Sequence, residues 1–151
     1  MLLQGHIKER HGINMVILCI DLGMARTGVA ASDPSEFLAS PVGTIEEKNK
    51  KALLTKLAGI ASERNAGRIV VGHPRNMDGS RGESALRAER LAAELERLTG
   101  LPVVLRDERL TTVSAAHILN ETNTRGKKRK AVIDTVSAVV LLQEYLDSSP
   151  K

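Results

Sequence analysis

Three acidic residues lie where the chain is expected to pass from one structural element to the next. Asp21 follows the apolar run 16–20, Glu108 comes shortly after the run 103–105, and Asp134 is expected in the first turn of an apolar C-terminal helix. An acid that follows apolar residues, as Asp21 does, is costly to bury unless it is paired or bound to a cation. Three convergent carboxylates repel one another, and hard divalent ions such as Mg²⁺ or Mn²⁺ prefer oxygen ligands of this kind. The three acids are therefore candidate ligands of a shared metal site.

The same acids also have ordinary structural roles open to them. Asp134 could cap a helix or interact with the dipole at its N-terminus, and Glu108 could form an ion pair with Arg109 or Arg26. The pattern of acids does not by itself decide between these roles and metal binding.

Hydrophobic periodicity indicates the elements that must position the acids. A meander of three short strands joined by tight turns is expected first, and then helices alternate with two further strands. The strands are expected at 16–20, 28–31, 42–45, 69–71 and 103–105, and the helices at 48–65, 84–98, 111–120 and 132–146. Gly67 is expected to end the first helix, and Leu91, Leu95 and Leu98 are expected to lie on one face of the second. This order predicts an α/β fold, a mixed five-stranded sheet covered by helices.

The predicted sheet brings two of the acids together. Open α/β sheets bind ligands outside the carboxyl ends of their strands. Asp21 closes the first strand and Glu108 follows the fifth, so both are expected at the same edge.

Length and composition limit the domain organisation and the kinds of protein to consider. The 151 residues suit one domain, expected over 15–147, with a disordered leader or start artefact at 1–14 and a frayed tail at 148–151. Cys19 is the only cysteine, which excludes an internal disulfide and suits a reducing cytoplasm. The sequence contains no apolar run near the roughly 20 residues that a membrane helix needs, so no membrane association is expected.

Most of the excess positive charge lies in one segment. The net charge is +4, and five positive residues fall within 125–130, namely Arg125, Lys127, Lys128, Arg129 and Lys130. Five like charges and Gly126 predict a mobile loop, which would lie beside Asp134 and attract a polyanion; a solvated loop that only aids solubility is the alternative. Aromatic residues make up 1% of the chain, so nucleic-acid binding would depend on charge, backbone amides and arginine planes rather than on stacked aromatic rings.

Four motifs, in order along the chain, resemble the YqgF/RuvX family, whose fold is ribonuclease H-like. They are DLGMARTGVAASD at 21–33, GHPRNMDG at 72–79, DERLTT at 107–112, and KKRK at 127–130 followed by Asp134 and LLQ at 141–143. The resemblance covers about residues 16–146. Two positions depart from the family pattern, because His73 stands where an apolar residue is usual and Arg106 where an aromatic residue is common. His73 could be a metal ligand, a base or a residue that lines a loop.

The resemblance implies a metal-dependent nuclease that hydrolyses phosphodiester bonds. It maps the family's acids onto Asp21, Glu108 and Asp134, with Glu108 preferred over Asp107 for its longer reach. Two Mg²⁺ or Mn²⁺ ions about 4 Å apart would activate a water and stabilise the leaving oxygen. Phosphate oxygens would be held by basic side chains, namely Arg26, Arg109, Lys127, Lys128, Arg129 and Lys130.

The implied substrate is the precursor of small-subunit ribosomal RNA, at the 5′ end of its 16S segment. Holliday-junction cleavage or another DNA-repair nuclease is the alternative, so the partner is RNA, branched DNA or single-stranded DNA, and the protein is a monomer or homodimer. A non-catalytic nucleic-acid-binding protein is a second alternative, although unneutralised acids would weaken phosphate binding. An ATPase of the actin and sugar-kinase type would need a second domain, for which 151 residues leave no room.

Overall fold

A computed structural model describes residues 15–110 and 126–148, with the side chains of 110 and 126–134 outside the description. The predicted leader at 1–14, the helix predicted at 111–120 and residues 149–151 of the predicted tail also lie outside the described residues. No helix among the described residues is long and apolar enough to cross a membrane.

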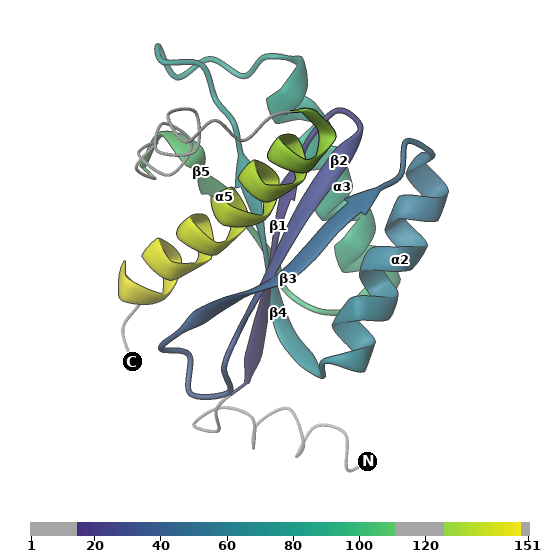
Figure 1. Cartoon of the computed structure of the whole chain (residues 1–151), viewed down its shortest axis with the longest axis vertical. Helices are drawn as coiled ribbons and strands as arrows, with labels where there is room; N and C mark the ends of the chain where they lie inside the picture. Colours follow the sequence, from purple (N-terminus) through teal and green to yellow (C-terminus); the bar gives the residue numbers. More distant parts are fainter. Residues whose placement is uncertain (1–14, 111–125, 149–151) are drawn as a thin grey trace.

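The centre of the fold is a mixed sheet of five strands (Figure 1). The strands are β1 (Val16–Leu22), β2 (Arg26–Ser32), β3 (Ala39–Glu46), β4 (Ala66–His73) and β5 (Val103–Asp107), in the spatial order β3-β2-β1-β4-β5. The first three strands form the predicted antiparallel meander, whereas β4 is parallel to both β1 and β5. The prediction of a mixed five-stranded sheet covered by helices is confirmed.

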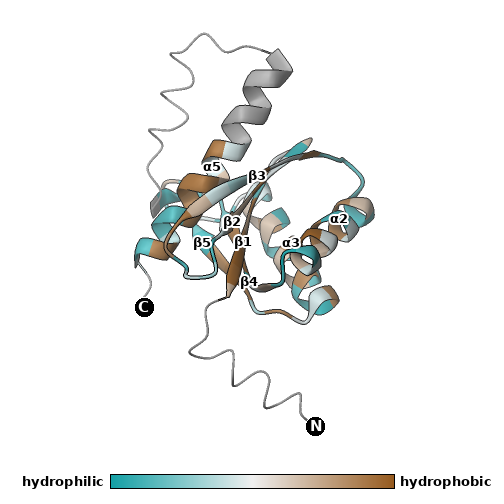
Figure 2. Ribbon diagram, turned by 60° about the horizontal axis from the view of Figure 1, so that its bottom comes forward, coloured by the Kyte–Doolittle hydropathy of each residue, from teal (hydrophilic) through white to brown (hydrophobic). Residues whose placement is uncertain are grey.

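Helices cover both faces of the sheet, so that the molecule has three layers (Figure 2). Helices α2 (Lys50–Glu63) and α3 (Glu83–Thr99) lie on one face, and α5 (Gly126–Ser148) crosses the other. A short 3-10 helix, η1 (Glu108–Leu110), follows β5 directly. The predicted strands and helices that fall within the described residues are all present, and the observed elements differ from them mainly in length.

Alternating side chains of the central strand supply both halves of the core. Leu18 and Ile20 of β1 pack with α2 and α3, whereas Ile17 and Cys19 pack with α5. Successive side chains of a strand point to opposite faces, so a strand buried on both sides becomes apolar along its whole length. The next residue in the series, Asp21, therefore falls on the α5 side of the sheet.

Residues at the ends of α2 and α3 explain where these helices begin and end. Asn49 caps α2 by accepting a hydrogen bond from the Ala52 amide, and Gly100 ends α3 with a left-handed φ of 75°. The prediction that Gly67 ends α2 is wrong, because Asn65 takes the left-handed conformation (φ 55°) and Gly67 already belongs to β4. Leu91 and Leu95 of α3 are buried, whereas Leu98, near the end of the helix, is 52% exposed.

Residues 126–130 of the basic segment are helical, which contradicts the mobile loop predicted for them, and Arg125 lies outside the described residues. Helix α5 begins at Gly126, so Lys127, Lys128, Arg129 and Lys130 lie in its first turns. Lysine and arginine are good helix formers, and extending an existing helix is much easier than nucleating one. The apolar residues of the second half of α5 are anchored on the sheet and can hold such an extension, with Ala138, Leu141, Leu142 and Leu146 all buried.

We predict that Ser32→Ala lowers the free energy of unfolding by about 1–3 kcal/mol. The Ser32 hydroxyl accepts a buried hydrogen bond of 2.8 Å from the Ile17 amide at the start of β1. Alanine would leave this buried donor without its acceptor. Urea denaturation monitored by circular dichroism measures the change, with Ser62→Ala on the exposed surface of α2 as the control. Equal stability of the two variants would contradict the prediction.

Candidate active site

Strands β1, β4 and β5 run in the same direction and end at one edge of the sheet. Asp21 lies near the end of β1, His73 and Asp107 are the last residues of β4 and β5, and Glu108 opens η1. The side chains of Asp21 and Glu108 are hydrogen-bonded to each other. The expected meeting of these two acids at the carboxyl edge is therefore observed.

The Glu108 carboxyl group is partly withdrawn from water. Its burial raises the pKa above the ordinary value of 4.5, and the hydrogen bond with Asp21 and the nearby His73 oppose this shift. The contact brings two carboxyl groups together in a place where a cation could stabilise both as anions. The pair thus offers hard oxygen donors of the kind that divalent cations such as Mg²⁺ prefer.

Gly72 provides the space through which the two acids meet. Strand β4 lies between β1 and β5, so the Glu108 side chain must pass over β4 to reach Asp21. A Cβ atom at Gly72 would collide with Oε2 of Glu108 and would lie 3.0 Å from Cδ2 of Leu141 in α5. Any larger residue at position 72 would therefore push the Glu108 carboxylate away.

The neighbouring acid, Asp107, belongs to a different set of contacts. Its Oδ2 lies 2.6 Å from Nη2 of Arg109, and this guanidinium lowers the pKa of Asp107 to about 2. Arg109 also donates a hydrogen bond of 3.3 Å to the Met77 carbonyl in the loop between β4 and α3. The two neighbouring acids thus make different contacts, because Glu108 meets Asp21 whereas Asp107 binds Arg109.

The two arginines predicted to hold phosphate oxygens both have acidic partners in this structure. Arg109 pairs with Asp107, as described, and Nε of Arg26 lies 3.3 Å from Oε2 of Glu46. Arg26 opens β2 and Glu46 closes β3, so this ion pair lies at the same edge of the sheet as Asp21. Phosphate contacts by either arginine would compete with these pairs.

His73 has a partner on α3. Its Nε2 lies 2.7 Å from Oε2 of Glu89, and Nε of Arg81 lies 3.1 Å from the same oxygen. The imidazole is almost completely buried, which fits a histidine that joins β4 to α3. Sequence inspection did not identify Glu89 as its partner, because the two residues lie 16 positions apart and on different elements.

Asp134 lies inside α5 rather than in its first turn. The helix starts at Gly126, so a role for Asp134 as an N-terminal cap is excluded. The adjacent Thr135 shares a hydrogen bond of 2.6 Å with Thr44 of β3, which holds this part of the helix backbone against the sheet. The Asp134 side chain and those of Lys127, Lys128, Arg129 and Lys130 lie outside the described residues. Within the described part of the chain, no group of three or more histidine, cysteine or acidic residues is placed to hold a metal ion.

Two solved structures share this architecture. The chain matches Thermus thermophilus RuvC bound to a Holliday junction substrate with a TM-score of 0.57 and 10% identity, over 89% of this chain and 98% of that one. It matches the fowlpox virus resolvase bound to Holliday junction DNA with a TM-score of 0.57 and 11% identity, over 91% and 100% of the two chains. These likenesses confirm the predicted ribonuclease H-like fold.

Sequence relatives are much more similar. A protein of Lachnospira eligens named "Putative pre-16S rRNA nuclease" is 46% identical over 140 residues, which cover 91% of this chain and all of the relative. A Mycobacterium tuberculosis protein of the same name is 45% identical over 131 residues, covering 86% of this chain and 77% of the relative. The family profile described as "RuvX: Holliday junction resolvase" matches residues 15–148. The chain therefore belongs to the RuvX family.

Proposed function

We propose that this protein is a divalent-metal-dependent nuclease that hydrolyses phosphodiester bonds at the 5′ end of 16S ribosomal RNA within its precursor. The observation that carries the proposal is the contact between the Asp21 and Glu108 carboxyl groups at the carboxyl edge of the sheet. The names of relatives at 45–46% identity support the RNA substrate. Work on ribosomal RNA would place the protein in the cytoplasm.

The acids of the site would hold the metal. Asp21 and Glu108 already share one side of the sheet, and Asp134 comes from the helix that covers that side. Asp134 precedes Ala138 and Leu141, both buried against the sheet, by four and seven residues, a spacing that repeats on one face of a helix. When bound, Mg²⁺ or Mn²⁺ would activate a water molecule and stabilise the leaving oxygen.

The remaining residues would organise the substrate around the acids. Gly72 keeps the path of the Glu108 side chain open, and the Asp107–Arg109 pair holds the end of β5 to the loop that follows β4. The basic start of α5, defined as Lys127, Lys128, Arg129 and Lys130, lies one to two helical turns before Asp134 and would contact backbone phosphates. Arg26 would contribute to the same phosphate binding from the start of β2.

Cleavage of branched DNA is the second candidate activity. The description of the matching family as a Holliday junction resolvase favours it. Both activities use the same acids, and they differ in whether the substrate is a precursor RNA or a four-way junction. A homodimer would suit a symmetric junction, whereas a single RNA end needs only one active site.

We predict that Asp21→Asn abolishes cleavage almost completely and leaves the fold intact. The substitution preserves the shape of the side chain, removes one negative charge from the metal-binding acids and relieves carboxylate repulsion. The measurement uses labelled precursor RNA, single-stranded DNA and a four-way junction with Mg²⁺, Mn²⁺ or a chelator. The wild type should cut the precursor RNA only with metal. Unchanged cleavage by Asp21→Asn would refute the assignment of the site, and exclusive cutting of the junction would establish the second candidate.

We predict that Gly72→Ala lowers the cleavage rate about a hundredfold, since displacement of a reacting group by about 1 Å can cost this much. The new methyl group would displace the Glu108 carboxylate from Asp21. Gly59→Ala in α2 is the matched control, because a Cβ there meets nothing within 4 Å. The control should keep full activity and gain about 0.5–1 kcal/mol of stability. Equal activity of the two alanine variants would show that Glu108 need not lie beside Asp21.

We predict that changing Lys127, Lys128 and Lys130 to alanine weakens binding of RNA and DNA of any sequence to a similar degree. Phosphate contacts carry no sequence information, and each lost contact reduces the salt dependence of binding by about one unit in the log–log slope. The affinity is measured against salt concentration in an Asp21→Asn background. Identical slopes for the triple variant and its parent would show that the basic start of α5 is only a solvated surface.

A further inference from the structure

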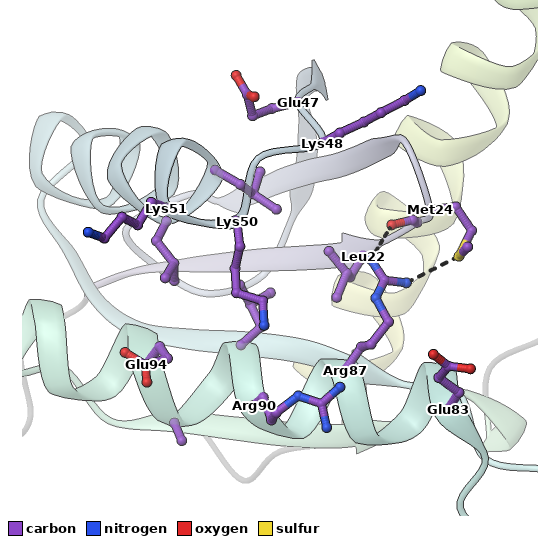
Figure 3. Close-up of a pocket in the computed structure, with 15 residues that line it drawn as sticks. Leu22, Met24, Glu47, Lys48, Lys50, Lys51, Glu83, Arg87, Arg90 and Glu94 are labelled. Atoms are coloured by element: carbon purple, nitrogen blue, oxygen red, sulfur yellow. Dashed lines mark hydrogen bonds between the residues drawn. The ribbon is translucent and has the colours of Figure 1, made fainter.

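A cavity of about 520 Å³ lies between α2, α3 and the turn that follows β1 (Figure 3). This volume is within the range of pockets that bind small molecules. Its floor is apolar and includes Leu22, Leu53, Leu54 and Leu91. The cavity belongs to the α2 and α3 side of the sheet, because Leu22 packs with the core on that side. None of the residues proposed above to hold metal lines it.

The rim of the cavity is basic. It carries five cationic residues, Lys48, Lys50, Lys51, Arg87 and Arg90, and three acidic ones, Glu47, Glu83 and Glu94. Two of these acids form ion pairs with cations that do not line the cavity, since Glu47 pairs with Lys56 at 2.9 Å and Glu94 pairs with Arg97. The positive charge of the rim therefore exceeds its negative charge, which favours an anionic ligand.

The positions of individual cationic side chains also favour an anionic ligand. Lys50 extends from the start of α2 toward α3, where Arg87 and Arg90 lie (Figure 3). Among the side chains that the structure describes, Lys50 and Arg90 have no carboxylate partner within salt-bridge distance, and both are exposed. Arg87 instead donates a hydrogen bond of 3.1 Å to the Gly23 carbonyl and so holds the turn after β1 against α3.

Consecutive residues of the chain belong to the cavity and to the candidate active site. Leu22 on its floor follows Asp21 directly, and the two side chains lie on opposite faces of β1 because successive residues of a strand alternate. The turn at Gly23 and Met24 separates the two sites, and the Met24 side chain is 80% exposed. A nucleic-acid strand whose scissile phosphate lies at Asp21 could pass over this turn and reach the cavity.

We propose that this cavity binds a nucleotide of the single-stranded substrate segment that flanks the scissile phosphate. The base would lie on the leucine floor, and its phosphate would contact Lys50 and Arg90. Such a site suits a protein with few aromatic residues, since it holds a base by apolar contact with leucines and its phosphate by charge, without stacked aromatic rings. The inference rests on the proposed function, because it takes the strand at Asp21 to be the substrate.

The test measures binding without cleavage. In an Asp21→Asn background, Lys50→Ala and Arg90→Ala are each compared with Arg64→Ala, which removes the same charge from the exposed far end of α2. The probes are a short fluorescent single-stranded RNA, the corresponding single-stranded DNA, AMP and inorganic phosphate. Each cavity variant should weaken binding of single strands about fivefold near 0.1 M salt and lower the salt slope by about 0.7, whereas Arg64→Ala should change neither.

Two outcomes would overturn the inference. If the cavity variants lose AMP or phosphate binding while strand affinity is unchanged, the cavity binds a free nucleotide or ion instead of the substrate. If neither kind of probe is affected beyond the Arg64→Ala control, the cavity binds no phosphate ligand. Failure of the proposed function is distinguishable from both, because it would appear as wild-type protein that cuts no substrate although the cavity variants still weaken strand binding.

Discussion

The alternation of side chains along β1 is the constraint on which the other features depend. This strand is central in the sheet and buried on both faces, so Leu18 and Ile20 must serve the α2 and α3 layer while Ile17 and Cys19 serve the α5 layer. Where the strand emerges from the core, the same alternation assigns Asp21 to the side of α5 and Leu22 to the side of α2 and α3. The candidate active site and the basic cavity thus lie on opposite faces of the sheet because consecutive side chains of β1 point to opposite faces.

The active-site side of the sheet depends on a second constraint, which is distance across the strands. Asp21 and Glu108 come from β1 and from the end of β5, with β4 between them. Their carboxyl groups meet because Glu108 is long and Gly72 has no side chain to obstruct it. Helix α5 closes this side with Leu141, so the proposed metal site and the core packing use the same small volume.

Much of this arrangement could be predicted from the sequence, and the failures have identifiable causes. Buried strands that end in Asp21 and Asp107-Glu108 predict a common edge because parallel strands align their carboxyl ends. The roles of Asp107 and Glu108 could not be separated, since they depend on contacts with Arg109 and Gly72 that come from other elements. The basic segment was predicted as a loop from its charge, but tertiary anchoring of Leu142 and Leu146 sustains the helix back to Gly126. The cavity was not predicted, because its lining comes from three segments far apart in the chain.

The open space at Gly72 also bears on how such a protein can change over generations. Every glycine codon is a single base from codons for alanine and valine, and either residue would intrude on the place that Glu108 occupies. The obstructing atoms are the ends of flexible side chains, so the folded protein would survive the replacement while its acids moved apart. A lineage that no longer needed the proposed catalytic activity could therefore lose it in one mutational step and keep the intact scaffold for another use.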